Sequence, residues 1–147
     1  MTTRRVTTTK TVVIGLAVAL IMLGALQVSA TVQADPSIET FWAKFKAAVI
    51  KGDKEPIAAM SQFPVDMPYG FPTIKTKPQL LKRYREVFNT QANAAKCFAA
   101  AKPEVDAANK NRFTVACKDE AGNEVVIYGF ARTRGVWKLR SLDNINE

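Results

Sequence analysis

Apolar positions between Ser37 and Met60 recur at spacings of three and four residues. This spacing places them on one stripe of a helix, with the lysines of the segment outside the stripe. Ser37 is the predicted N-cap, Gly52 the predicted stop, and Asp53 the predicted cap of a second, shorter helix. The pattern therefore predicts a long aromatic helix, a Gly-Asp turn and a short helix. The stripe consists of Ile38, Phe41, Trp42, Phe45, Ala48 and Val49.

The middle of the chain predicts an edge strand followed by a third helix. Apolar residues alternate over residues 63–72, but three prolines and one glycine interrupt them, which favours a short strand at the edge of a sheet. Residues 76–88 predict a helix that Thr76 caps, with Pro78 in its first turn. The alanine-rich residues 89–101 are compatible with either a helix or a strand.

Three segments near the C-terminus predict an antiparallel meander, over residues 112–118, 124–132 and 136–142. The middle segment is apolar on both faces, so it is expected at the centre of the sheet. Helices first, strands last and a single core indicate an α+β fold. In this fold the N-terminal helices pack on a curved antiparallel sheet.

The last of these strands is expected to alternate strictly. Trp137, Leu139 and Ser141 would then share the face that packs on the core. Lys138 and Arg140 would occupy the other face. Asp143, which follows, is open to two interpretations: it points into the mouth of the sheet, or it belongs to a terminal turn.

The N-terminus predicts a targeting segment. An uncharged apolar run over residues 11–26 follows basic residues, and cleavage motifs that end in a small residue occur at residues 28–30 and 32–34. This order is typical of a secretory signal peptide, here residues 1–34. The basic residues are Arg4, Arg5 and Lys10.

Signal-peptide cleavage is expected after Ala34, with Ala30 as the next choice. Cleavage leaves residues 35–147 as one domain in the periplasm or secreted, because a chain of this length builds one hydrophobic core. The alternative is a membrane-tethered protein that keeps residues 11–32 as an uncleaved anchor, since ~20 apolar residues span a bilayer.

Charge gives little indication of a partner. The full chain has a net charge of +8. Removal of the signal peptide takes three of the 21 basic residues, which leaves 18 against 13 acidic residues, a net charge of +5. This excess is mild and spread along the chain, so no nucleic-acid partner is predicted.

The chain contains two cysteines, Cys97 and Cys117. In an oxidising compartment such a pair is expected to form a disulfide, which would stabilise the fold by about 3 kcal/mol on the chain-entropy model. The alternative is two buried free thiols. Because no C-x-x-C spacing is present, a redox role is not predicted.

Two stretches carry a resemblance to a known family: FWAKFKAAVIKGDKEPIAAM (residues 41–60) and GVWKLRSLDNI (residues 135–145). Together with the order of predicted elements, they resemble the NTF2-like superfamily, also called SnoaL-like or cystatin-like, and in particular its small exported bacterial members of uncharacterised function. The resemblance covers nearly all of residues 35–147. It implies a cone-shaped fold, and its motifs are architectural without catalytic content.

The resemblance also implies a pocket between the helices and the sheet. Enzymes of the superfamily, such as isomerases and dehydratases, use an Asp or His base there, often with a Tyr donor. This chain has no histidine, so a histidine base and a histidine-ligated metal are both excluded. Asp66 is then the candidate base and Tyr69 a candidate donor. Alternatively, Asp66 is an exposed or turn-forming residue between two prolines. No metal or cofactor is predicted.

Six aromatic residues are candidates for lining a pocket for an apolar ligand. The alternative is that they fill the core. The leading hypothesis is an exported, non-catalytic domain that binds a small apolar ligand or a protein partner. Its alternatives are an isomerase- or dehydratase-like enzyme that uses Asp66, and the membrane-tethered module. Dimerisation through the sheet, common in the superfamily, adds a homodimer as a further partner. The aromatic residues are Trp42, Phe45, Tyr84, Tyr128, Phe130 and Trp137.

Overall fold

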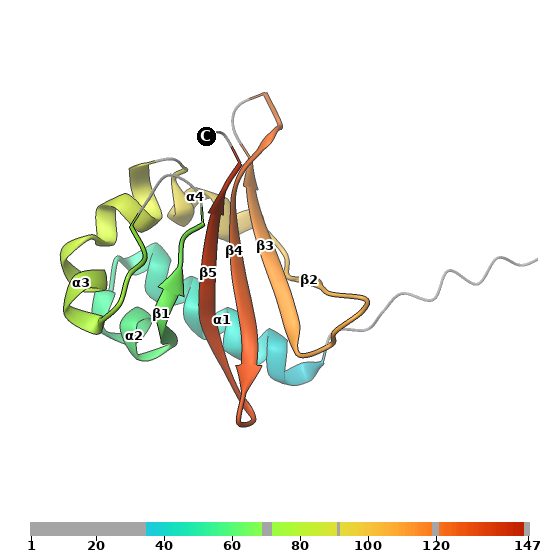
Figure 1. Ribbon diagram of the computed structural model, residues 1–147. Helices are drawn as coiled ribbons and strands as arrows, with labels where there is room; N and C mark the ends of the chain where they lie inside the picture. Colours follow the sequence, from blue (N-terminus) through green and yellow to red (C-terminus); the bar gives the residue numbers. More distant parts are fainter. Residues whose placement is uncertain (1–34, 69–71, 91, 119–120, 146–147) are drawn as a thin grey trace, which may run out of the picture. The chain divides into compact units, whose positions relative to one another are not determined.

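The computed structural model describes residues 35–68, 72–90, 92–118 and 121–145 (Figure 1). The predicted signal peptide and Tyr69 lie outside these residues. The described chain begins with α1 (Pro36–Lys51) and α2 (Lys54–Ala59). The two helices and the turn between them confirm the arrangement that the apolar spacing predicts.

Helix α1 is capped by a residue other than the predicted one. Asp35 Oδ1 accepts a hydrogen bond from the Ser37 backbone N–H at 2.9 Å, so Asp35 is the N-cap. The Ser37 hydroxyl instead accepts from Trp137 Nε1 at 2.9 Å. At the other end Gly52 has φ +68°, the left-handed conformation that glycine adopts without strain. The predicted cap was wrong because the helix already begins at Pro36, and proline suits the first helical position after a capping aspartate.

The predicted third helix is divided. Thr76 caps it as expected, with its Oγ1 accepting from Gln79 N–H at 3.4 Å. The α-helix then ends at Lys82, with Arg83 as its C-cap, and the chain continues into a wider π-helical segment. The ambiguous alanine-rich stretch contains a helix that the Asn93 side chain caps. These elements are α3 (Lys77–Lys82), η1 (Glu86–Thr90) and α4 (Ala94–Ala100).

The sheet has five strands in the order β1-β5-β4-β3-β2. Neighbouring strands from β2 to β5 pair antiparallel, which confirms the predicted meander with β4 at its centre. Strand β1, which contains Pro64, lies at the edge as predicted, but it pairs parallel with β5, so the sheet is mixed. The strands are β1 (Ser61–Asp66), β2 (Glu104–Val105), β3 (Arg112–Lys118), β4 (Glu124–Thr133) and β5 (Val136–Asn144).

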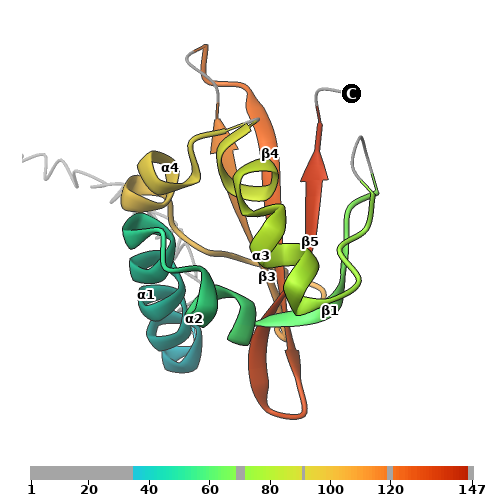
Figure 2. The same cartoon turned by 90° about the vertical axis from the view of Figure 1, so that its left-hand side faces the viewer.

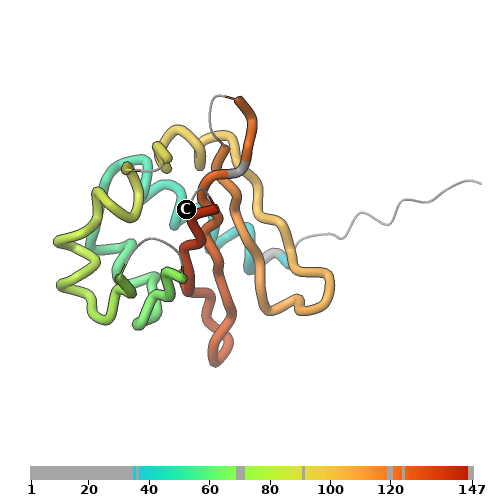
Figure 3. The backbone as a smooth tube through the Cα atoms, turned by 45° about the horizontal axis from the view of Figure 1, so that its top comes forward, coloured from blue at the N-terminus to red at the C-terminus, as the bar shows by residue number. Residues whose placement is uncertain are grey.

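The described domain is therefore α+β, with its helices gathered against one face of the sheet. Helix α1 crosses behind the long strands in Figure 1, and Figure 2 shows α1 and α4 on the same side of them. Figure 3 follows the chain from the cyan and green N-terminal helices to the orange and red strands. We call the opposite side of the sheet, which carries Arg112, Thr114, Gly129 and Ala131, the helix-free face.

A β-bulge in β5 changes which residues reach that face. Gly129 of β4 lies opposite Ser141, and the next residue, Phe130, lies opposite Leu139, so Arg140 is an extra residue in β5. Ser141 consequently lies on the helix-free face and Leu142 is buried. The prediction that Ser141 faces the core with Trp137 was wrong, because strict alternation takes no account of an inserted residue.

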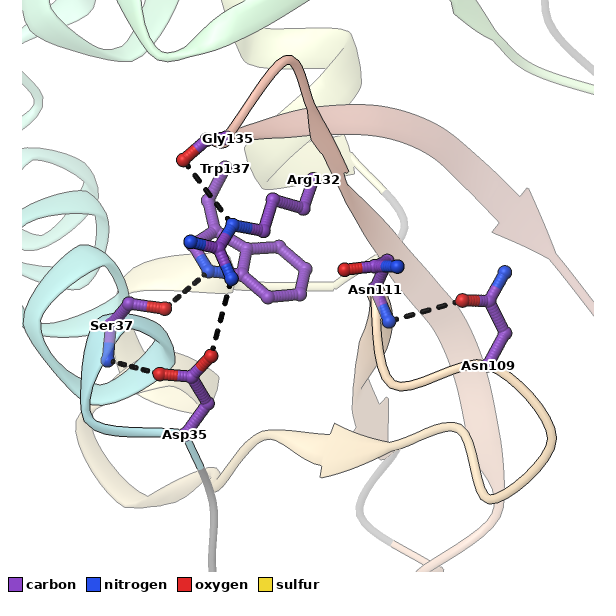
Figure 4. Close-up of polar contacts among 7 residues, drawn as sticks. All are labelled: Asp35, Ser37, Asn109, Asn111, Arg132, Gly135 and Trp137. Atoms are coloured by element: carbon purple, nitrogen blue, oxygen red, sulfur yellow. Dashed lines mark hydrogen bonds and ion pairs between the residues drawn. The ribbon is translucent and has the colours of Figure 1, made fainter.

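Two connections tie the helices to the strands. Cys97 of α4 and Cys117 of β3 form a disulfide, with 2.00 Å between their sulfur atoms. At the start of α1, Arg132 donates to Asp35 Oδ2 at 3.4 Å and to the Gly135 carbonyl at 3.3 Å (Figure 4). Figure 4 also shows the bond between Trp137 and Ser37. These contacts hold the first turn of α1 against the β4–β5 hairpin.

Candidate functional site

A pocket of about 460 Å³ opens on the helix-free face; we call it the sheet-face pocket. Its floor follows one row of the sheet, because Thr114 pairs with Gly129, Gly129 with Ser141, and Ser141 with Asp66 of the edge strand. Ala131 lies beside this row and also lines the pocket. The floor therefore consists of small side chains, and this choice of residues creates the hollow.

Gly129 is required by the closeness of its neighbour. A Cβ atom built on Gly129 would overlap with Ser141 Oγ. Since Gly129 carries no side chain, the Ser141 hydroxyl sits directly over the β4 backbone. The glycine thus serves close packing in the pocket floor rather than an unusual backbone angle.

Charged residues surround this floor. Asp106 follows β2, and its backbone N–H donates to the Arg112 carbonyl at 3.1 Å, which places the two residues side by side. The Asp106 Oδ1 atom accepts from the backbone N–H groups of Ala108 at 2.8 Å and Asn109 at 3.2 Å. The Asn109 side chain in turn accepts from the Asn111 N–H at 3.0 Å (Figure 4). The charged lining residues are Asp66, Asp106, Arg112, Arg140 and Asp143.

Most of these charges have no protein partner. Within the described ranges of the chain, Asp66, Arg112, Arg140 and Asp143 form no ion pair. Partial burial raises the pKa of Asp143, and the nearby Arg112 opposes this rise without reaching ion-pair distance. The pocket therefore presents guanidinium and carboxylate groups that remain available to a ligand.

The six aromatic residues singled out from the sequence come together on the other face. All six are buried. Their rings are in mutual contact through further aromatic side chains; Phe45 and Phe130 have centroids 5.1 Å apart, and Trp42 and Phe98 are 4.8 Å apart. Such edge-to-face packing is the usual arrangement of a hydrophobic interior. A ligand cavity among these residues stays a prediction; Phe130 is the one member that also lines the sheet-face pocket.

The tyrosine hydroxyls of the core already have partners. Tyr128 donates to the Val87 carbonyl at 2.9 Å, and Tyr84 donates to the Val49 carbonyl at 3.5 Å. Burial raises the pKa of both phenols, so both stay protonated at physiological pH. These hydroxyls therefore act as structural donors to two helical carbonyls.

Asp66, the candidate base, lines the sheet-face pocket at the end of β1. Its side chain is exposed, so it lacks the apolar burial that the base hypothesis requires. Tyr69 lies outside the described residues, and the role of the pair stays a prediction. Among the residues that the structure describes, no three His, Cys, Asp or Glu side chains are grouped so as to hold a metal ion.

Sequence reasoning missed most of this pocket. Arg140 was predicted on the face opposite the core, but no pocket was predicted there and Arg112 was given no role. The missing information was the bulge that adds Ser141 and Asp143 to that face. The signal that was present, a glycine flanked by apolar residues in a central strand, marks a close approach but does not identify the neighbour.

The described residues were also compared with known proteins. No family model matches the chain, and no curated protein matches its sequence. Solved structures do match. A ketosteroid isomerase-like protein from Erwinia carotovora atroseptica is 16% identical, with a TM-score of 0.43, over 76% of this chain and 95% of the other.

Two further structures carry the same fold names. An NTF2-like protein with a cystatin-like fold from Novosphingobium aromaticivorans is 16% identical, with a TM-score of 0.41, over 74% of this chain and 78% of the other. A protein with a cystatin-like fold from Nostoc punctiforme is 17% identical, with a TM-score of 0.41, over 74% and 86%. These names are those of the family that the sequence resembles. At these TM-scores, nothing about the family, binding or catalysis of this chain follows from the matches.

Proposed function

We propose that the chain is an exported, non-catalytic binding domain that holds a small polar ligand in the sheet-face pocket. The observation that supports this proposal is a hollow of about 460 Å³ whose charged side chains are largely without ion-pair partners in the described chain. A volume of this size suits a small molecule. An apolar ligand has less support, because the aromatic residues that would hold it pack against one another.

Export is supported by two independent features. The N-terminal sequence has the order of a secretory signal, and the Cys97–Cys117 disulfide is typical of oxidising compartments. Among the described residues, no helix is long and apolar enough to cross a membrane. Mass spectrometry of the protein from the producing cell tests this part. We expect a chain that begins at Asp35 or Thr31; an intact N-terminus would instead support the membrane-tethered alternative.

The enzyme alternative has one supporting observation, the place of Asp66 in the pocket lining next to Ser141. An isomerase or dehydratase that uses Asp66 would lose turnover in Asp66→Asn while still binding its substrate. A binding domain has no turnover to lose. A screen of small polar compounds supplies candidate ligands, and assays of proton exchange on those ligands would separate the two functions.

The binding function is tested by filling the pocket. Ala131→Leu adds a side chain within the lining, and Ala116→Leu adds the same side chain on the same face outside it. We expect a screen of small polar compounds to find ligands that raise the Tm of the wild type and of Ala116→Leu, but not of Ala131→Leu. Ligands that stabilise both variants equally would contradict the proposed site, and a screen without ligands would contradict the function.

A further inference from the structure

We propose that the ligand of the sheet-face pocket is a small zwitterion of about dipeptide size, with its carboxylate on Arg140 and its ammonium group on Asp143. This inference rests on the proposed function and names the class of ligand that the same pocket accepts. It is carried by the signs of the charges, by their positions on β5 and by the space above Gly129.

The mixture of charges disfavours ligands that carry charge of a single sign. Asp66, Asp106 and Asp143 would repel a simple anion such as phosphate, and the guanidinium groups of Arg112 and Arg140 would repel a simple cation. A metal ion is also disfavoured, since the described residues offer no cluster of three ligating side chains. A molecule that carries one charge of each sign can satisfy both kinds of group.

The bulge in β5 sets the separation of the two charges. Arg140 and Ser141 are consecutive residues on the helix-free face, and Asp143 is the next residue of β5 on that face. Arg140 and Asp143 are three residues apart, and three residues of a strand span roughly 10 Å between their Cα atoms. An extended dipeptide separates its charged ends by roughly 7 Å. The long, flexible side chain of Arg140 can lean along the strand, so its guanidinium can approach the Asp143 carboxylate to the length of a dipeptide.

Asp143 and Arg140 each lack an ion-pair partner among the described residues, and each would gain one from the ligand. Partial burial disfavours the charged form of Asp143, and Arg112 compensates only from beyond ion-pair distance. An ammonium group from a ligand would stabilise this carboxylate directly. Among the described residues Arg140 forms no side-chain hydrogen bond or ion pair, so its planar guanidinium can donate two parallel N–H···O bonds to a ligand carboxylate. The hollow over Gly129 and Ala131 leaves room for the body of the ligand.

The experiment compares three probes by isothermal titration calorimetry with the domain of residues 35–147, disulfide intact. The probes are L-alanyl-L-alanine, its N-acetyl derivative, which lacks the ammonium group, and its C-terminal amide, which lacks the carboxylate. We expect the zwitterion to bind most tightly. Each capped probe should bind roughly 10- to 100-fold more weakly, the size of a lost hydrogen bond between charged groups.

Two variants assign each end of the probe to its residue. In Arg140→Gln the difference between the dipeptide and its amide should disappear, while the difference from the N-acetyl form remains. In Asp143→Asn the opposite pattern is expected. Control variants remove the same charges outside the lining: Lys118→Gln on the helix-free face and Asp53→Asn in the turn before α2. A merely structural effect would weaken all three probes together and would not change their ratios.

The outcomes separate the inference from the proposed function. If the capped probes bind as well as the dipeptide, or the variants leave the ratios unchanged, the zwitterion inference is overturned and the pocket remains a binding site. If no probe binds but other compounds bind in a manner that Ala131→Leu abolishes, the inference is again overturned and the function stands. If nothing binds in either experiment, the proposed function fails as well.

Discussion

The two faces of the sheet are built from the same strands and have opposite character. In β3, Phe113, Val115 and Cys117 are fully buried under the helices, whereas Arg112 and Thr114 line the sheet-face pocket. On the helix side the polar groups have partners, as in the bond from Tyr128 to the Val87 carbonyl. On the helix-free face, Arg112, Arg140 and Asp143 form no ion pair with any described residue.

This difference divides the tasks of the domain. Burial of aromatic surface stabilises the fold, and each ring contacts several others, so one loss affects many contacts. Charged groups without partners contribute little to stability and are retained where a ligand uses them. We therefore expect substitutions on the core face to change the free energy of unfolding, and substitutions in the pocket to change binding.

The largest effect is expected from Phe45→Ala. The Phe45 ring is 0% exposed and contacts the rings of Phe41, Trp42, Phe88, Phe98 and Phe130. Removing it should lower the free energy of unfolding by about 3–5 kcal/mol, measured by urea denaturation. Ile50→Ala on the same helix is the control; Ile50 is 48% exposed and should change stability by less than about 1 kcal/mol. Equal losses would contradict the division between buried and exposed surface.

The second effect concerns the disulfide on the core face. Replacing both Cys97 and Cys117 by alanine should lower the free energy of unfolding by about 3 kcal/mol, because the bridge joins positions 20 residues apart and restricts the unfolded chain. The measurement is urea denaturation of the variant beside the oxidised wild type. The affinity of the sheet-face pocket for L-alanyl-L-alanine should stay the same. A loss of binding with folding retained would show that the two faces are coupled.

A smaller effect is expected where the pocket floor is tightest. Gly129→Ala places a methyl group against Ser141 Oγ, so the hydroxyl must rotate away, at a cost of about 1 kcal/mol. In a Ser141→Ala background the nearest remaining side-chain atom is Ser141 Cβ, at 3.5 Å, and the cost should disappear. A double-mutant cycle on thermal unfolding measures this coupling. Additive effects of the two substitutions would rule out the close contact.

The smallest effect is a pair of opposite pH dependences. Burial raises the pKa of Asp143 in the folded protein, so its contribution to stability falls as pH rises through the range just above the ordinary aspartate pKa of about 3.9. The Ser37 backbone N–H, then its hydroxyl and then Arg132 lower the pKa of Asp35, although slight desolvation opposes them. The contribution of Asp35 is therefore present above the unfolded pKa and is lost as pH falls.

Thermal unfolding at pH 3 and pH 7 distinguishes the two aspartates. At pH 7, Asp143→Asn should be more stable than the wild type and Asp35→Asn less stable. Both differences should shrink at acidic pH, where the wild-type carboxyl groups become protonated. Differences of the same sign at pH 7 would show that one of the two environments is described incorrectly.

Local patterns in the sequence predicted much of this fold. Periods of 3.6 and 2 residues located α1 and the three long strands, because burial of one face imposes those periods on the chain. The features that were missed depend on distant partners. The parallel pairing of β1 is one of them, because its partner β5 lies at the far end of the domain sequence.

The candidate site was less predictable for the same reason. Asp66 was identified because a resemblance pointed to a carboxylate at that place, and it does line a pocket. The resemblance placed the pocket among the aromatic residues, whereas the described hollow lies on the helix-free face. Its members come from four strands and one turn, so only the pairing register brings Arg112, Gly129 and Asp143 together.

Arg140 has an unusual standing among the residues of β5. Arg140 is the extra residue of the bulge opposite β4. Deleting it would join Leu139 to Ser141 and give β4 and β5 a regular pairing, with Leu142 still facing the core. The fold could thus accommodate the loss of this residue, whereas the proposed zwitterion site would lose the guanidinium that binds the carboxylate.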